Sequence, residues 1–272
     1  MQTQVRRVFL ATVVCVLGSA LVAPALAQDG AADPFPFLFT LEGEIEPDMM
    51  AEFSEAVGKI VEAHQQHDNG NMWSAYAPLT GGGSPMFRFF IPLQKIGDMD
   101  GWTPNPQILG EVHGPEAAGE IIDALGACWA PASSLLAFNP AVSNPNPDWS
   151  GGAPRFAYYL RVSVTSAMIR EYFSLAQQMA QAHRTHEDGL HWVGYMNAIG
   201  GEGREIHYFI GMDKLGEMDA WPLNAQVMID SLGAEAWQKL QKRFNEIASV
   251  HSEILVLSPP HSNLGALSND DG

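Results

Sequence analysis

The sequence repeats itself at a spacing of 119 residues, and this repeat constrains the fold more than any other feature. The residues His64, His67, Gly70, Trp73 and Tyr76 recur as His183, His186, Gly189, Trp192 and Tyr195. The same register continues without an insertion to the segment Gly97-x-Met99-Asp100-x-Trp102, which recurs as Gly216-x-Met218-Asp219-x-Trp221. One register shared by so many uncommon residues predicts two copies of one folding module in tandem.

The limits of the two copies follow from composition. We expect the first copy to span residues 34–142 and the second to span residues 155–260. Residues 143–154 between them are rich in Asn, Pro, Gly and Ser, which is typical of a linker. Residues 261–272 have a similar composition, so we expect a disordered tail there.

Each copy shows the same succession of hydrophobic patterns. A short apolar strand precedes a helix whose apolar residues recur every three or four positions, and two strands then flank a glycine-rich turn. A second helix and a last strand complete the copy. In the first copy these elements are expected at 35–41, 50–64, 72–77, 86–91, 115–130 and 135–138, and in the second at 156–162, 169–183, 191–197, 205–212, 234–252 and 254–257. The order β-α-β-β-α-β predicts an α+β fold of two ferredoxin-like modules.

Each such module leaves one face of its sheet without helices, and packing the two faces together would bury both. The chain thus resembles the dimeric α+β barrel superfamily, which includes NIPSNAP-like proteins, antibiotic-biosynthesis monooxygenases and the chlorite dismutase group. The resemblance rests on the element order, the long first helix, the Gly-x-Met-Asp-x-Trp segments and the duplication. It implies two tandem ferredoxin-like modules packed sheet to sheet as an intramolecular dimeric α+β barrel, and a monomer. No catalytic motif of these families matches residue by residue, so no site residue follows from it.

Residues 1–27 predict export. Arg6 and Arg7 precede an apolar run that ends in Ala25-Leu26-Ala27, the pattern of a cleaved signal peptide. We therefore expect a periplasmic or secreted protein that has no membrane segment after cleavage. The net charge of −17 would become −19 once Arg6 and Arg7 are lost, which disfavours nucleic acid as a partner.

The candidate ligand-binding residues lie on the predicted strands. Arg88 and His207 occupy the same repeat position among apolar neighbours. If that strand face lines the barrel lumen, these two residues predict a pocket for an aromatic acid or another amphipathic anion. If it faces the helices or an edge, they are surface residues instead.

The strand aromatics are further candidates. Trp73, Tyr76, Trp192 and Tyr195 recur on the second strand of each copy. Within each pair Trp and Tyr have opposite parity, so one faces the core and the other can face the lumen.

The His-x-x-His pairs suggest a metal site, with His183, His186 and His191 as its candidate ligands. The alternative is structural, because imidazoles in a last helical turn favour the negative end of the helix dipole and cap carbonyl groups. We favour the structural interpretation and expect neither a bound metal nor an organic cofactor.

The sequence lacks the Gly-x-Ser-x-Gly, phosphate-loop and His-Glu-x-x-His motifs, which argues against hydrolase, kinase and dehydrogenase activities. We expect the barrel to bind a small apolar or aromatic molecule. One alternative is a cofactor-free enzyme of the monooxygenase type, in which His207 or Tyr195 takes a proton from an acidic substrate. Another is a haem or metal protein that uses the His-x-x-His segments.

Overall fold

The computed structural model describes residues 34–67, 71–79, 85–149, 152–201, 204–221 and 223–264. The predicted signal peptide, Gly70 and residues 265–272 lie outside this described part. The first half contains β1 (Phe37–Glu44), α1 (Met50–Gln66), β2 (Ser74–Pro78), β3 (Met86–Leu93), α2 (Asn105–His113), α3 (Pro115–Cys128) and β4 (Ala132–Phe138). The second half contains β5 (Phe156–Val164), α4 (Ile169–Thr185), β6 (Val193–Ile199), β7 (Glu205–Met212), α5 (Leu223–Leu232), α6 (Ala234–Ile247) and β8 (Ala248–Leu257).

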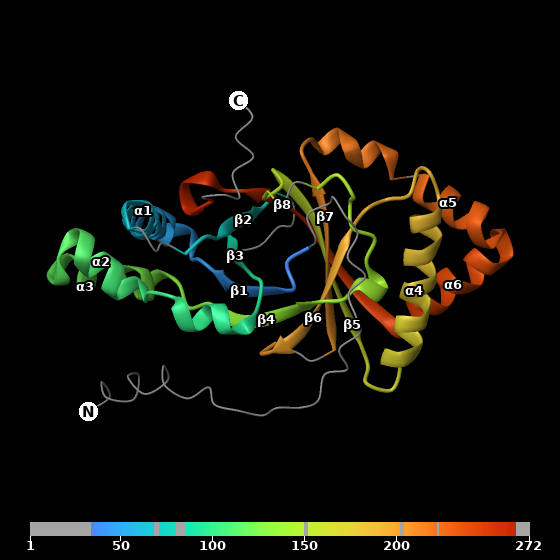
Figure 1. Cartoon of the computed structure of the whole chain (residues 1–272), viewed down its shortest axis with the longest axis horizontal. Coiled ribbons are helices and arrows are strands. Elements are labelled where there is room, and N and C mark those ends of the chain that lie inside the picture. Colours follow the sequence, from blue (N-terminus) through green and yellow to red (C-terminus); the bar gives the residue numbers. More distant parts are fainter. Residues whose placement is uncertain are drawn as a thin grey trace. The chain divides into compact units, whose positions relative to one another are not determined.

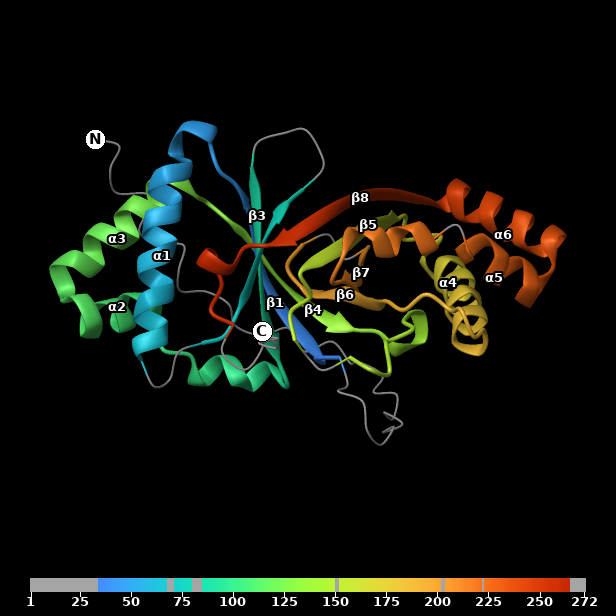
Figure 2. The same cartoon turned by 90° about the horizontal axis from the view of Figure 1, so that it is seen from above.

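The eight described strands form one closed antiparallel barrel in the order β1-β3-β2-β8-β5-β7-β6-β4. Each half contributes four adjacent strands, and the halves join edge to edge where β2 pairs with β8 and β4 pairs with β6. Helices α1–α3 lie beside the strands of the first half and α4–α6 beside those of the second (Figures 1 and 2). The structure therefore confirms a mixed α+β barrel.

Strand alternation divides the side chains between two environments. On β3, Phe87 and Phe89 pack against α1 in the core of the first half, whereas Arg88 and Phe90 face the lumen. Since Phe53 of α1 is fully buried against these aromatics and Trp129, the helix layer holds the outer face of the barrel rigidly. The lumen is left to polar and aromatic side chains.

The helix expected at 115–130 is found at Pro115–Cys128, and a helix that was not predicted, α2, precedes it and begins at Asn105 behind Pro104. One other predicted helix boundary is wrong. The helix expected to reach residue 252 ends at Ile247, because Ala248 and the following residues pair with β5 from Val164 onwards. The pattern around Val250 and Ser252 is compatible with a helix and with a strand. Pairing with β5 selects the strand.

The predicted disordered tail is wrong for residues 261–264, which are part of the fold. His261 packs against Phe53 and Phe87, and its carbonyl accepts a hydrogen bond from the Trp73 indole at 2.8 Å. The Ser262 hydroxyl accepts the backbone N–H of Ala75, and Asn263 forms a β-bridge with Trp73. This segment follows the last strand of the second half, yet it seals the first half.

The predicted linker is wrong in the same way at its start. Ser143 is fully buried, its hydroxyl accepts the N–H of Gly194, and Asn144 forms a β-bridge with Trp192. The Trp192 indole donates to the Val142 carbonyl at 2.7 Å. These contacts repeat those of residues 261–263, so each half is closed by a segment that follows the other half's last strand.

We expect Ser262→Ala and Ser143→Ala each to lower the free energy of unfolding by about 1–3 kcal/mol, because each leaves a buried backbone N–H without its acceptor. Urea unfolding of the full chain measures this, with exposed Ser252→Ala as the control that should change little. A silent Ser262→Ala would contradict an ordered segment at 261–264.

None of the described helices is long and apolar enough to cross a membrane.

Candidate functional site

Among the described residues the barrel contains two cavities that share Phe90 as a lining residue, and the ring centroid of Phe90 lies 5.2 Å from that of Phe209. The polar chamber, of about 120 Å³, is lined chiefly by Thr40, Glu42, Arg88, Tyr159, Arg161, Glu205 and His207. The aromatic chamber, of about 360 Å³, is lined chiefly by Phe35, Tyr76, Phe90, Trp149, Trp192, Tyr195 and Phe209. Arg88 and His207 therefore line the lumen, which decides the alternative left open by their sequence pattern.

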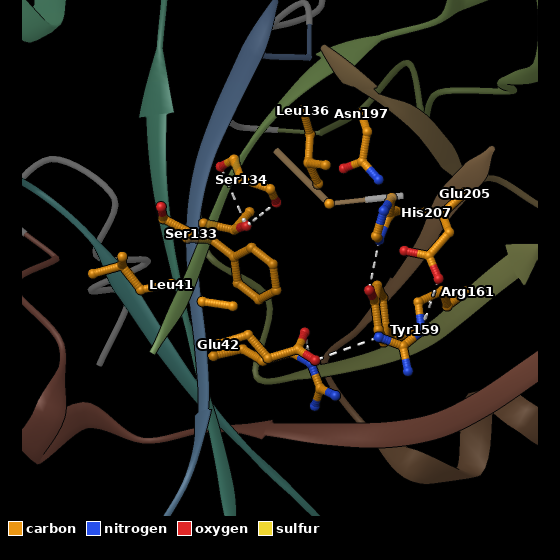
Figure 3. Close-up of a pocket in the computed structure, with 15 residues that line it drawn as sticks. Leu41, Glu42, Ser133, Ser134, Leu136, Tyr159, Arg161, Asn197, Glu205 and His207 are labelled. Carbon is orange, nitrogen blue, oxygen red and sulfur yellow. Dashed lines mark hydrogen bonds and ion pairs between the residues drawn. The ribbon is translucent and has the colours of Figure 1, made fainter. Parts of the chain in front are cut away.

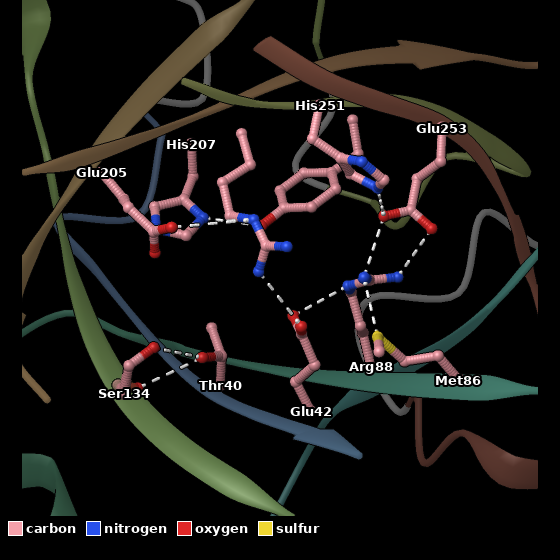
Figure 4. Close-up of polar contacts among 11 residues, drawn as sticks. Thr40, Glu42, Met86, Arg88, Ser134, Glu205, His207, His251 and Glu253 are labelled. Atoms are coloured by element: carbon pink, nitrogen blue, oxygen red, sulfur yellow. Dashed lines mark hydrogen bonds and ion pairs between the residues drawn. The ribbon is translucent and has the colours of Figure 1, made fainter. Parts of the chain in front are cut away.

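Arg88 is buried and fully engaged by carboxylates (Figure 4). Its Nε donates to Glu42 at 2.9 Å, and its terminal nitrogens contact both oxygens of Glu253 at 2.8 and 3.0 Å. The guanidinium also lies over the Tyr159 ring, 5.2 Å from its centroid. Since two carboxylates already match its one charge, Arg88 is poorly suited to hold the anion that its sequence context suggested.

Arg161 occupies the position of Glu42 in the second half and lies beside it across the chamber. Its NH1 nitrogen approaches Glu42 at 3.4 Å and its Nε approaches Glu205 at 3.8 Å. These distances exceed those of the Arg88 pairs, and about a third of the Arg161 side chain is exposed. The chamber is thus lined by several oppositely charged pairs, and the pairs of Arg161 are longer than those of Arg88.

Among the described residues, His207 has one hydrogen-bond partner, Tyr159 (Figure 3). The Tyr159 hydroxyl and His207 Nδ1 are 2.6 Å apart, and both side chains are buried. Burial, with the nearby charges of Arg161 and Arg88, lowers the pKa of His207 from 6.5 to about 4. The imidazole is therefore neutral at neutral pH. Burial also raises the pKa of Tyr159, so the phenol keeps its proton.

In the aromatic chamber, Tyr76 and Tyr195 occupy equivalent positions and are fixed in equivalent ways. Tyr76 donates its hydroxyl to the Pro154 carbonyl at 2.8 Å, and Tyr195 donates to the Phe35 carbonyl at 3.0 Å. Each acceptor lies just before the first strand of the opposite half. Burial raises the pKa of both phenols. The two rings are thus fixed as walls of the chamber, and the hydroxyl of Tyr195 is engaged in its hydrogen bond to Phe35.

The two tryptophans differ in position. Trp73 is buried in the core of the first half, with its ring edge on His64, and does not line either chamber. Trp192 contacts His183 in the corresponding way but also lines the aromatic chamber. Of the aromatic candidates, Tyr76, Trp192 and Tyr195 are therefore brought together and Trp73 is not.

The candidate metal ligands do not converge. His183 is buried and its Nδ1 accepts the backbone N–H of Leu190 at 3.0 Å, as His64 Nδ1 accepts that of Asn71. His186 faces Asp230 at 3.6 Å, and His191 lies at the aromatic chamber. Within the described ranges, no three His, Cys, Asp or Glu side chains gather in a way that could hold a metal ion.

The sequence patterns missed Glu42, Tyr159, Arg161 and Glu205 of the polar chamber, and also Glu253, which contacts Arg88. A signal was present, because Glu42 lies two residues from Thr40, and Tyr159 and Arg161 two from one another, on strands that are otherwise apolar. Charged residues at every second strand position indicate a shared polar face.

Comparisons with known proteins support the fold. A protein of Fusobacterium nucleatum subsp. nucleatum, provisionally assigned as a monooxygenase, aligns with 82% of this chain and 93% of its own at a TM-score of 0.52 and 9% identity. An anthrone oxidase-like protein aligns with 84% of this chain and 94% of its own (TM-score 0.47, 14% identity). A chlorite dismutase variant of Candidatus Nitrospira defluvii aligns with 85% and 94% (TM-score 0.46, 13% identity).

The Fusobacterium structure shares the fold of this chain, and the other two are too distant to add to that comparison. No protein-family model matches the sequence. No curated protein matches it either.

Proposed function

We propose that the barrel binds a small apolar or aromatic molecule in the aromatic chamber. The observation that supports this most is the set of aromatic rings around a cavity of about 360 Å³ inside the barrel mouth. Cavities of this size with mostly apolar walls and a few polar groups are typical of small-molecule sites. Burial of the ligand's apolar surface would supply most of the affinity, at about 25 cal/mol per Å².

The walls are positioned before any ligand arrives. Tyr76 and Tyr195 are anchored to backbone carbonyls, and Phe209 contacts both Phe90 and Tyr195. Binding would therefore cost little ordering of side chains. The rim carries Asp148, Asp213 and Glu217, and no Lys or Arg lines the chamber within the described residues. This charge balance favours a neutral ligand over an anion.

A second candidate is a cofactor-free enzyme of the monooxygenase type. It is favoured by the fold shared with the Fusobacterium protein and by the buried, neutral His207, whose Nδ1 lone pair Tyr159 would have to release before the imidazole could take a proton. Tyr195, the alternative proton acceptor, is less suited because its hydroxyl donates to Phe35. Oxygen uptake in the presence of a bound aromatic substrate would support this candidate.

We further propose that the two halves arose by tandem duplication of a ferredoxin-like module. The mature chain would act as a monomer, because its second half takes the place of a partner subunit. Its place of action would be outside the cytoplasm. Sedimentation of the purified chain and its amino-terminal sequence in the native host test these proposals.

The binding proposal is tested by filling the aromatic chamber. Val193 lines it without being fully buried, so Val193→Trp would place an indole in the ligand's space. With 2-naphthol as the probe, calorimetry should show saturable binding to the parent chain and an affinity at least about tenfold lower for Val193→Trp. Val250→Trp, at an exposed valine of β8, is the matched control and should bind like the parent. Equal binding by both variants, or none by the parent chain, would refute the proposal.

A further inference from the structure

We propose that the polar chamber is a second binding site, in which Nε2–H of His207 donates a hydrogen bond to a neutral carbonyl oxygen of a small molecule. This site is separate from the aromatic chamber and does not depend on the function proposed for it. The two chambers have one lining residue in common, Phe90.

The position of the imidazole proton follows from the hydrogen bond to Tyr159. Within the described part of the chain, the Tyr159 hydroxyl has one hydrogen-bond partner, His207 Nδ1 at 2.6 Å. A buried phenol that keeps its proton must donate it or lose a hydrogen bond. Tyr159 therefore donates to Nδ1, and the single proton of the neutral ring is placed on Nε2.

The Nε2 atom is an unused donor on a residue that lines the chamber, and a ligand reaches it by displacing the side chains that now cover it. It is buried, and no other described protein group lies within hydrogen-bonding distance of it. His207 as a whole is only 7% exposed and is one of the chamber's lining residues (Figure 3). A buried donor without an acceptor is costly, so a ligand oxygen at this place would remove a penalty as well as add a hydrogen bond.

The charges of the chamber select for a neutral acceptor. Arg88 and Arg161 provide two positive charges on the chamber wall, and Glu42 and Glu205 provide two negative ones. Glu253, which contacts Arg88, adds a third negative charge next to the chamber (Figure 4). An anion would have to displace Glu42 or Glu253 from a guanidinium and would add to an existing negative excess. A carbonyl oxygen accepts from Nε2 without disturbing these pairs. The cavity of about 120 Å³ limits the ligand to a few non-hydrogen atoms.

Nitrogen NMR of the uniformly ¹⁵N-labelled chain tests the proposal, with His207→Gln used to assign the ring signals. At neutral pH we expect Nε2 to be protonated and Nδ1 to be unprotonated. Cyclopentanone should shift the Nε2–H signal saturably, with a dissociation constant on the order of 1–10 mM. Cyclopentanecarboxylate, its anionic counterpart, should leave the signal unchanged over the same range.

Three controls make the outcome decisive. Tyr159→Phe should mix the two tautomers and weaken the response to cyclopentanone, because Nδ1 loses its donor. Val193→Trp should leave this response unchanged, since it blocks only the aromatic chamber. A proton on Nδ1 in the parent chain, tighter binding of the carboxylate than of the ketone, or no saturable shift would each overturn the proposal.

Discussion

Replacing Arg88 by methionine should lower the free energy of unfolding by about 3–5 kcal/mol, as expected when one partner of a buried ion pair is removed. Arg88 is 2% exposed, and Glu253, which it contacts through two nitrogens, is 8% exposed. Methionine has a similar length and leaves the packing of the lumen largely intact. The loss would come from a buried carboxylate left without its counter-charge, and urea unfolding measures it.

The double variant Arg88→Met/Glu253→Gln separates charge from packing. Because the glutamine removes the unpaired charge, it should restore more than half of the lost stability. Arg161→Met is the matched control: Arg161 contacts carboxylates at longer distances and is a third exposed, so its loss should cost at most about 1 kcal/mol. Equal losses for Arg88→Met and Arg161→Met would show that the buried network is not what holds this end of the barrel.

The α+β class and the barrel could be predicted because several local patterns agree. The periodicity of α1, the aromatic alternation on β3 and the repeat register all indicate the same module. The opposite parity of Trp73 and Tyr76 matches a core-facing ring and a lumen-facing ring, whereas Trp192 and Tyr195 both line the aromatic chamber. Where neighbouring elements of one half determine the environment, sequence reasoning succeeded.

Prediction failed where the environment comes from the other half of the chain. Ser143 and Ser262 have the composition of loops, yet each accepts a buried N–H from a strand more than 50 residues away. The matched charges around Arg88 also escaped prediction, since Glu253 lies 165 residues away. Contacts of this kind leave no local pattern, because each partner looks like an ordinary polar residue in its own segment.

In the polar chamber the two halves carry different residues at equivalent positions. Glu42 and Arg161 are 119 residues apart and therefore occupy equivalent positions, yet they contact each other at 3.4 Å. Two identical modules would place the same side chain at both positions, and like charges at this distance would repel. Opposite charges can face each other at these equivalent positions only if the two halves carry different residues. The same holds for Arg88 and His207, so the asymmetric chamber depends on having both modules in one chain.

Replacing Gly189 by alanine should lower the free energy of unfolding by about 3 kcal/mol, near the upper end for overpacking. A β-carbon at Gly189 would overlap the carbonyl oxygen of His183, a backbone atom that can move only if the end of α4 moves with it. That shift would disturb the hydrogen bond from Leu190 N–H to His183 Nδ1 and, through it, the Trp192 wall of the aromatic chamber.

The matched control is Gly58→Ala in α1, where a β-carbon meets nothing within 4 Å. This change should stabilise the protein by about 0.5–1 kcal/mol, because alanine has the better helix propensity. Unfolding in urea gives both values, and 2-naphthol binding reports on the chamber. If Gly189→Ala did not lower the free energy of unfolding, the turn after α4 would be able to accommodate a β-carbon. The end of α4, with His183, would then not be what positions Trp192. A large loss at Gly189 together with weaker 2-naphthol binding would instead show that the spacing of His183, Gly189 and Trp192, which recurs within the sequence, determines the shape of the chamber.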